Sequence, residues 1–442
     1  MDDNAEGLIR FCRVNQNGVA YEIIDAAIAE EVINTHDIMI IAGKPWTYAE
    51  GVYHQDDGGL YVQHYIKNLI VWNLKNDARI SRVYRLIMKD IRLQVNIDDV
   101  NKYPLHWVNF KNGMVDIKEK KIHPHSPKYK SIFQIPHRYC PDLDINNSIF
   151  HKFLQSRMNV DNQQMLYESI SHCLLPVVVF QKFLVLVGDG ENGKTVILNH
   201  VERLLGKDNI SAIKLQELSD RFTTEKLLGK QANICADIPS TALKDTSTLK
   251  LLTGQDLVKG EYKGGNVFFF RNTAKFIFSC NELPIVLDDR SNGFFRRLLI
   301  IRFQGKGEFI PDLYEKLSNE NEIEILLSYL VDRVKFALER GKVYESRENL
   351  AEISKLREES DSIEGFLNNA TTPNKEGRVR RPDLFNAYLD FCRNEDRTPL
   401  GKVAFFKGLR TKGYRETKSC GKNYICGFEL GFMDTDSSPF DD

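Results

Sequence analysis

The sequence has no apolar run that approaches the ~18 residues needed to span a bilayer. Its first residues, MDDNAEGLIRF, lack the basic and apolar regions of a signal peptide. The eight cysteines are scattered without C-x-x-C spacing, which argues against a zinc site and indicates a reduced, cytoplasmic protein. Net charge is nearly absent, at -1. A membrane protein is therefore not expected, and any affinity for nucleic acid must come from local clusters of charge.

One such cluster lies near the C-terminus, where thirteen basic and six acidic residues occur between Lys375 and Lys422. Pro382 suits the first turn of a helix, and residues 399–430 predict a second, basic helix followed by a two-strand wing. This order suits a groove of duplex DNA, with contacts expected from Arg380, Arg381, Lys402, Lys407, Arg410 and Lys412. The alternative is a small protein-contact domain with a solvated basic face.

Before residue 182 the sequence patterns are mixed. The first 145 residues combine helical periodicity with short strand-like pieces and predict an α+β domain, with helices expected at 20–34, 62–74 and 80–95. Residues 146–181 place apolar side chains at helical spacing, so we expect a helical hairpin, or collar, that leads into the next domain.

Short apolar runs alternate with helical stretches in residues 182–345. The runs are KFLVLV, ANICAD, KFIFSC and LLIIRF, and continuous runs of this kind predict a parallel sheet covered by helices. Residues 346–432 are expected to hold a charged helix (348–367), a turn-rich linker (368–377) and the basic segment. The acidic residues 433–442 predict a disordered tail.

The segment GDGENGKT satisfies G-x-x-x-x-G-K-[ST], after an expected strand and at the start of a helix that Gly206 would end. Glycines let backbone N–H groups turn inward around phosphate oxygens, Lys194 reaches the β- and γ-phosphates, and the Thr195 hydroxyl binds Mg²⁺. The expected nucleotide contacts are Gly188, Asp189, Gly190, Glu191, Asn192, Gly193, Lys194, Thr195 and Val196.

Polar residues mark the later strands of this domain. Asp237 ends ANICAD, where a carboxylate that holds Mg²⁺ or activates water is needed. Asn281 follows KFIFSC and could orient water against the γ-phosphate. Arg296 and Arg297 precede LLIIRF, and a guanidinium there can stabilise charge on a transferred phosphoryl group. Each position taken alone also fits a turn former or a solvated charge.

The segment KGEYKGGN lies between two apolar runs and predicts a hairpin turn. Lys259 and Lys263 would neutralise phosphate, and the Tyr262 ring could meet a base or a sugar. The alternative is a solvated hairpin tip with ordinary lysines.

These motifs together resemble the superfamily 3 helicases, in particular the branch of poxvirus primase-helicases, satellite phages, plasmids and mobile chromosomal islands. The similar segments are GDGENGKT (Walker A), NICADI (Walker B), LKLLTGQDLVKGEYKGGNVFFF (hairpin element), FIFSCNELP (sensor) and NGFFRRLLIIRF (arginine-finger region). The stretch VNFKNGMVDIKEKKIHPHSP is similar to the N-terminal domain of that branch, and the basic segment is similar to its winged-helix module.

The resemblance implies an α/β fold, with a P-loop AAA+-like parallel-sheet ATPase core between an N-terminal α+β domain and a C-terminal winged-helix domain. It implies that Lys194 contacts nucleotide, that Thr195 and Asp237 hold the metal, that Asn281 is the sensor, and that Arg297 is the trans-acting finger with Arg296 second. Many relatives have two Walker B acids, whereas Ala236 precedes Asp237 here. Either Asp237 serves both roles or Glu282 contributes.

The expected function is that of a replicative DNA helicase of a mobile element or virus, driven by ATP and Mg²⁺. The resemblance implies a homo-hexamer that moves 3′ to 5′ on single-stranded DNA at a fork. No primase signature is present, so a separate primase or polymerase is an expected partner. The alternative is an initiator that binds origin duplex DNA, in which ATP controls assembly and another motor unwinds.

Overall fold

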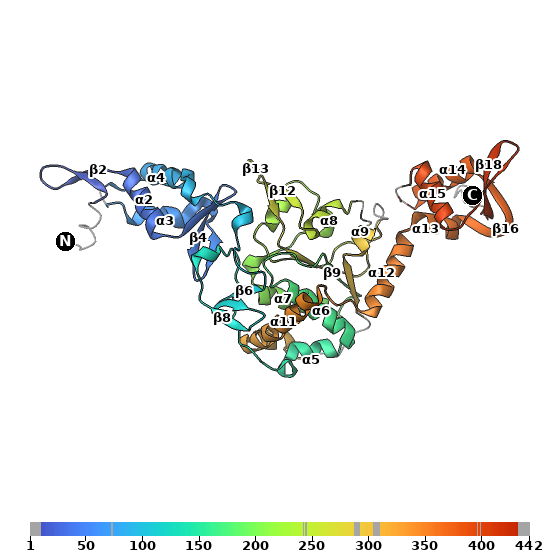
Figure 1. Ribbon diagram of the computed structural model, residues 1–442, viewed down its shortest axis with the longest axis horizontal. Helices are drawn as coiled ribbons and strands as arrows, with labels where there is room; N and C mark the ends of the chain where they lie inside the picture. Colours follow the sequence, from blue (N-terminus) through green and yellow to red (C-terminus); the bar gives the residue numbers. More distant parts are fainter. Residues whose placement is uncertain are drawn as a thin grey trace, which may run out of the picture.

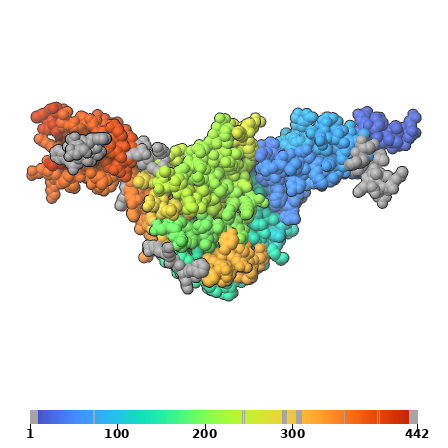
Figure 2. Space-filling model, turned by 180° about the vertical axis from the view of Figure 1, so that it is seen from behind, coloured from blue at the N-terminus to red at the C-terminus, as the bar shows by residue number. Residues whose placement is uncertain are grey.

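The computed structural model describes residues 10–71, 74–241, 243, 245–286, 292–303, 310–395, 397 and 399–431. The expected acidic tail, 433–442, lies outside them. The chain forms an N-terminal part and a C-terminal part on opposite sides of a larger central part (Figure 1). Figure 2 shows the same arrangement from behind. No helix among the described residues is both long and apolar enough to cross a membrane.

Five parallel strands form the central sheet, in the order β10-β11-β14-β9-β15. Their bounds are β9 Phe183–Val187, β10 Ile210–Ser211, β11 Ala232–Cys235, β14 Lys275–Cys280 and β15 Leu298–Arg302. The four apolar runs thus form strands of one parallel sheet, as the sequence predicts. The two-residue strand β10 is an addition, too short to leave a pattern in the sequence.

Alternate residues of these strands enter two hydrophobic cores on opposite faces of the sheet. Leu184 and Leu186 of β9 belong to one core, and Phe183 and Val185 to the other. The first core contains α5 (Ile149–Gln155), α6 (Val160–His172), α7 (Lys194–Leu205) and α11 (Glu320–Arg340). The second contains α8 (Ser247–Thr253), α9 (Asn292–Phe295), the hairpin of β12 (Leu257–Glu261) and β13 (Val267–Arg271), and part of α12 (Arg347–Ser360).

Helix α12 covers the free edge of the sheet at β15. The backbone N–H of Ile300 donates to Oδ1 of the fully buried Asn349, at 2.7 Å. Nearby, Arg302 donates to the Glu352 carboxylate at 2.8 Å. An open strand edge is a site for unwanted pairing, and these contacts close it while fixing the helix that leads to the C-terminal part.

Among its described residues, the N-terminal part contains three α-helices and five short strands. They are β1 Cys12–Val14, β2 Ala20–Ile23, α2 Asp25–Thr35, β3 Ile38–Ile41, β4 Lys44–Ala49, β5 Val52–Gln55, α3 Leu60–Asn68 and α4 Asp77–Lys89. The helix expected at 20–34 begins only at Asp25, because its first residues pair as β2 with β1. The helices expected at 62–74 and 80–95 are present as α3 and α4, and each is shorter than expected.

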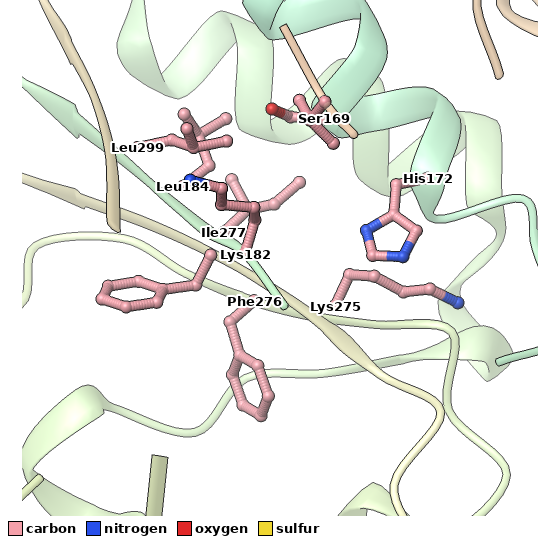
Figure 3. Close-up of a pocket in the computed structure, with 10 residues that line it drawn as sticks. Ser169, His172, Lys182, Leu184, Lys275, Phe276, Ile277 and Leu299 are labelled. Atoms are coloured by element: carbon pink, nitrogen blue, oxygen red, sulfur yellow. The ribbon is translucent and has the colours of Figure 1, made fainter. Parts of the chain in front are cut away.

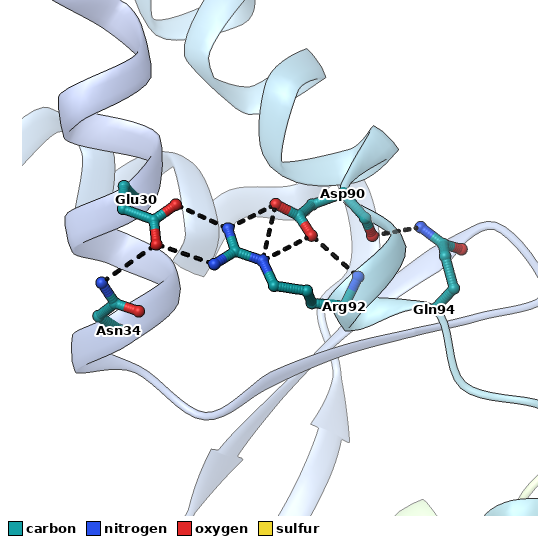
Figure 4. Close-up of polar contacts among 5 residues, drawn as sticks. All are labelled: Glu30, Asn34, Asp90, Arg92 and Gln94. Carbon is teal, nitrogen blue, oxygen red and sulfur yellow. Dashed lines mark hydrogen bonds and ion pairs between the residues drawn. The ribbon is translucent and has the colours of Figure 1, made fainter.

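An arginine joins two helices of this part (Figure 4). The Arg92 guanidinium donates to both oxygens of Glu30 on α2, at 2.8 and 2.7 Å, and also to Asp90 at the end of α4. Hydrogen bonds from Arg92 are the largest cause of the lowered pKa values of Glu30 and Asp90. Glu30 is half exposed and Asp90 is partly exposed, so the ion pairs orient the elements rather than dominate stability.

A three-stranded meander connects the N-terminal part to the central one. It is formed by β6 Trp107–Phe110, β7 Gly113–Asp116 and β8 Lys121–His123. Val108, Phe110 and Val115 lie in the same hydrophobic core as α6, α7 and α11. The sequence predicts a boundary at residue 146, but the central core already includes these earlier strands, because they pack on the central part.

The C-terminal part has its own core and a three-stranded sheet in the order β16-β18-β17. Its elements are α13 Ser362–Ala370, β16 Thr371–Arg380, α14 Arg381–Asn394, α15 Lys402–Thr411, β17 Glu416–Ser419 and β18 Lys422–Leu430. The expected linker, 368–377, is wrong: its first residues end α13 and the rest begin β16. The strand pairs with β18 around a bulge between Asn374 and Arg378, which explains its turn-like composition.

A buried polar cluster lies at the amino end of the central sheet, around a small cavity (Figure 3). Lys275, 3% exposed, donates from Nζ to the carbonyl of Leu175. His172 of α6 accepts at Nε2 from the N–H groups of Val179 and Phe180, at 3.0 and 3.2 Å. Burial and the neighbouring lysine hold the pKa of His172 well below its usual value. These bonds fix the turn between α6 and β9.

Burial lowers the pKa of Lys275 to about 7. The unfolded chain retains this proton up to about pH 10, so between about pH 7 and 10 it binds more protons than the folded chain. The free energy of unfolding should therefore rise with pH in this window, by at most about 1.4 kcal/mol per pH unit from this group. We expect Lys275→Met to reduce that rise, measured by urea unfolding at pH 7, 8 and 9. Equal slopes in wild type, Lys275→Met and the exposed control Lys128→Met would contradict this.

Candidate functional site

Residues from three strands meet at the carboxyl edge of the central sheet. The N–H of Gly188, directly after β9, donates to the Cys280 carbonyl at the end of β14, at 3.2 Å. The Asp237 N–H, two residues after β11, lies 3.3 Å from Ser279 Oγ of β14. Because β14 lies between β9 and β11, the loop after β9, Asp237 and Asn281 share this edge. The structure thus brings these predicted residues into one region.

The loop that joins β9 to α7 curls around a lysine. Lys194 begins α7 and is only 6% exposed. Its Nζ donates to the Gly188 carbonyl, to the Asp189 carbonyl at 2.8 Å and to Asn192 Oδ1 at 3.1 Å. The ammonium is therefore held inside the loop by three acceptors. Phosphate oxygens are stronger acceptors for an ammonium than neutral carbonyls.

Glycine is required at two positions of this loop. Gly193 has φ 96°, and a Cβ there would lie 2.6 Å from the Phe153 ring. Gly188 has φ 154°, and a Cβ there would lie 2.3 Å from Asn192 Nδ2. A side chain at Gly193 would therefore clash with Phe153 of α5, and one at Gly188 would clash with Asn192 of the same loop. The local sequence fixes the loop shape through these close approaches.

The electrostatics of the loop link it to Asp237. Burial lowers the pKa of Lys194, and the negative charge of Asp237 is the largest opposing influence. Asp237 is exposed and adopts φ 52°, in the left-handed region that few residues other than glycine enter. Strained residues of this kind cluster at functional sites. A carboxylate held near a buried ammonium at a sheet edge is suited to bind a cation.

The donors at this edge fit a nucleotide with Mg²⁺. Thr195, the second residue of α7, is exposed, as are Asp189, Gly190 and Glu191 in the loop. A hydroxyl and one carboxylate are a typical protein contribution to Mg²⁺, which keeps several waters and takes substrate phosphates as ligands.

Asn281 and Glu282 follow β14 directly, and both side chains are exposed. Either residue is free to face a ligand at the sheet edge. Both predictions for the group that activates water therefore remain, namely Asp237 alone or Asp237 with Glu282.

The two arginines before β15 differ in solvent exposure. Arg297 is 7% exposed, and its Nη1 donates to the Gly293 carbonyl at 2.6 Å. Arg296 is exposed, and its Nη2 lies 3.4 Å from Gln181 Oε1. The expectation that Arg297, ahead of Arg296, reaches another subunit does not fit this burial. Arg296 is the arginine that a second molecule could meet.

The predicted hairpin is present, but its tyrosine is covered. Lys44 of the N-terminal part places Nζ 4.6 Å from the Tyr262 ring centroid, and the Phe268 ring lies 4.9 Å away. Lys44 also pairs with Asp57 at 3.3 Å. Burial raises the pKa of Tyr262 to about 12. The expectation that this ring meets a base therefore does not fit this conformation.

The two hairpin lysines also differ. Lys259 pairs with Glu261 at 3.4 Å, and Glu261 accepts from Arg221 as well. Lys263 at the tip is exposed. Lys263 is thus the hairpin cation that is best placed to meet a phosphate.

The six cations expected to bind DNA in the C-terminal part fall into two groups. Arg381 pairs with Glu416 at 2.8 Å and lies 4.1 Å from the Phe406 ring centroid, and Lys412 pairs with Asp361 at 2.9 Å. Both residues take part in ion pairs within the fold, and their contact with DNA stays a prediction. The exposed members of the set are Arg380, Lys402, Lys407, Arg410 and Lys412, whereas Arg381 is partly buried.

Two functional candidates were missed by sequence reasoning. Arg302 pairs in register with Val187, the last residue before the loop, and is held by Glu352. Arg302 directly follows an apolar run in the sequence, and this position could have marked it as a candidate. Lys44 could not have been found, because its contact with Tyr262 joins segments more than two hundred residues apart.

Two family models match parts of the chain. Residues 27–158 match the family described as "D5 N terminal like", and residues 186–297 match "Family of unknown function (DUF5906)". The second match contains the loop, Asp237, Asn281 and both arginines. The first covers the N-terminal part from within α2 onward, the meander and α5.

The chain is similar to a protein of Acanthamoeba polyphaga mimivirus named "Putative helicase L207/L206", with 23% identity over 222 residues. That alignment covers 48% of this chain and 22% of the viral protein, so the chain spans about a fifth of its relative. Among solved structures, the apo NrS-1 C terminal region aligns with a TM-score of 0.52 and 12% identity, over 91% of this chain and 98% of that one. This likeness concerns the fold alone.

The Lys44–Tyr262 contact should hold the hairpin tip against the N-terminal part. A cation–π contact of this kind is worth about 0.5–1 kcal/mol, so Lys44→Met should raise the open population by about 2- to 5-fold. We expect trypsin to cleave after Lys263 faster by that factor, measured by mass spectrometry under native conditions. Lys89→Met, at an exposed lysine that ends α4, should leave the rate unchanged. Equal rates for both variants and wild type would show that the contact does not restrain the tip.

Proposed function

We propose that this chain is an ATP-driven DNA helicase of the superfamily 3 type that acts in replication. The observation that carries the proposal is the meeting of Lys194, Asp237 and Asn281 at one edge of a parallel sheet, with the exposed Arg296 before the adjoining strand β15. The sequence similarity to a viral protein named as a helicase supports the same function. The match of residues 27–158 to the D5 N terminal like family is a second, independent support.

ATP is the expected ligand of the loop. Lys194 would exchange its bonds to the Gly188 and Asp189 carbonyls for phosphate oxygens, which explains why an ammonium is kept there. Thr195 and Asp237 would hold Mg²⁺, with Asp237, alone or with Glu282, orienting the attacking water. When bound, Mg²⁺ neutralises the charge on the β- and γ-phosphate oxygens. Asn281 would contact the γ-phosphate side of the site.

The arginine of the reaction would come from a neighbouring subunit. Arg296 is exposed and Arg297 is buried, so we assign the trans-acting role to Arg296 and a positioning role to Arg297. Such an arrangement requires at least two neighbouring subunits, and the superfamily resemblance implies a homo-hexamer that moves 3′ to 5′. The hairpin would reach the DNA strand through Lys263 after it leaves Lys44.

A second function is favoured by the exposed cations of α15. We propose that α14, α15 and the β16–β18 sheet form a winged-helix module for duplex DNA. An initiator that binds an origin in this way would use ATP for assembly and leave unwinding to another motor. A separate primase or polymerase would be a partner in either case.

The helicase function predicts that Lys194→Ala abolishes both ATP hydrolysis and strand displacement on a forked duplex. The loop would lose its only ammonium aimed at the phosphates, and we expect a loss of at least about 100-fold. Lys207→Ala, an exposed lysine just beyond the other end of α7, is the control and should retain both activities. Wild type that hydrolyses ATP on DNA but never displaces a strand would favour the initiator instead.

The shared site predicts complementation between inactive variants. Lys194→Ala keeps its arginines and Arg296→Ala keeps its loop, so mixed rings contain some complete sites. We expect the mixture to regain part of the ATPase activity that neither variant has alone. If Arg297→Ala complements Lys194→Ala and Arg296→Ala is fully active, the assignment of the two arginines is reversed. If no mixture recovers and single subunits are fully active, the shared site is wrong.

A further inference from the structure

Helix α15 presents an exposed face without any acidic residue. The residues exposed on this helix are Lys402, Val403, Ala404, Lys407, Arg410 and Thr411. Val403 is 81% exposed, in the first turn of the helix. The face therefore combines three cations with adjoining apolar methyl groups. Cations bind phosphate groups, whereas an exposed apolar side chain among them is suited to contact an apolar group of the ligand.

The helix is fixed firmly enough to present this face with a defined geometry. Phe405, Phe406 and Leu409 of its opposite side are fully buried in the core of the C-terminal part. Gly408 faces α13 so closely that a Cβ there would lie 2.3 Å from Ile363 Cδ1. At the end of the helix, Lys412 pairs with Asp361 at 2.9 Å. Packing and the ion pair hold α15 from both its inner side and its end.

Basic residues also follow α15 along the chain. Arg415, Lys418 and Lys422, on and beside the β17–β18 strands, are exposed. A surface of this sign and length is complementary to the phosphates of nucleic acid. A helix fits the major groove of duplex DNA, where the thymine methyl is the one apolar group that a base edge offers.

We infer that α15 reads duplex DNA in the major groove, and that Val403 contacts the methyl group of a thymine. Ala404 borders the same contact, and Lys407 and Arg410 bind the flanking phosphates. This inference rests on DNA being the partner of the proposed function, but not on unwinding. It makes Val403 a residue that sets sequence preference rather than affinity.

The test uses the full chain without ATP and a pool of random duplexes. Selection by binding should enrich a site that contains thymine at a fixed position. Replacing that thymine with uracil removes only the methyl group, and should weaken binding by wild type about 5-fold, a typical effect for loss of one apolar base contact. Binding by Val403→Asn should be insensitive to this replacement. Val160→Asn is the matched control, since Val160 is 75% exposed in the first turn of α6.

A second variant separates phosphate binding from base reading. Lys407→Ala should weaken binding to all sequences alike and reduce the salt dependence of affinity by about one charge, with the thymine preference kept. The inference is overturned if selection enriches no sequence, or if uracil and thymine bind wild type equally. It is also overturned if Val403→Asn retains the preference. Strand displacement that depends on Lys194 but comes without duplex preference would overturn this inference alone and leave the helicase function in place.

Discussion

The order of the parallel strands is the constraint on which the candidate site depends. With β9 between β14 and β15, and β11 on the far side of β14, every carboxyl end points to the same edge. The loop that holds Lys194 follows β9, Asp237 follows β11 and Asn281 follows β14. Arg302 ends the fourth strand in register with Val187 and ties this edge to α12. The edge therefore has a direct mechanical connection to the C-terminal part.

The buried ammonium of Lys194 shows how this edge is prepared for an anion. Burial disfavours its charge, and loop carbonyls, the Asn192 side chain and nearby negative charges, Asp237 first among them, offset that cost. A triphosphate would supply what the loop lacks. At the hairpin, Lys44 contacts the Tyr262 ring, while Lys263 at the tip is exposed. At both places, we expect a ligand to replace the protein groups that now make these contacts.

Local patterns predicted the parts of the fold that depend on local physics. Four buried strands, the loop with its glycines and the helix from Lys194 to Leu205 follow from apolar runs and close backbone approaches. The features that local patterns missed depend on distant partners. Residues 371–380 form β16 because β18 is there to pair with, and the burial of Arg297 depends on packing that no local pattern reveals. The exposure of Arg296 and the cover on Tyr262 could not be read from the sequence for the same reason.

The central claim is that one sheet edge binds the triphosphate through Lys194 and Asp237. Its most direct test is a structure of the chain with Mg²⁺ and a non-hydrolysable ATP analogue. The account predicts that Lys194 Nζ leaves the Gly188 and Asp189 carbonyls for phosphate oxygens, and that Mg²⁺ lies between Thr195 and Asp237. A nucleotide bound elsewhere, or bound while Lys194 keeps both carbonyls, would contradict it.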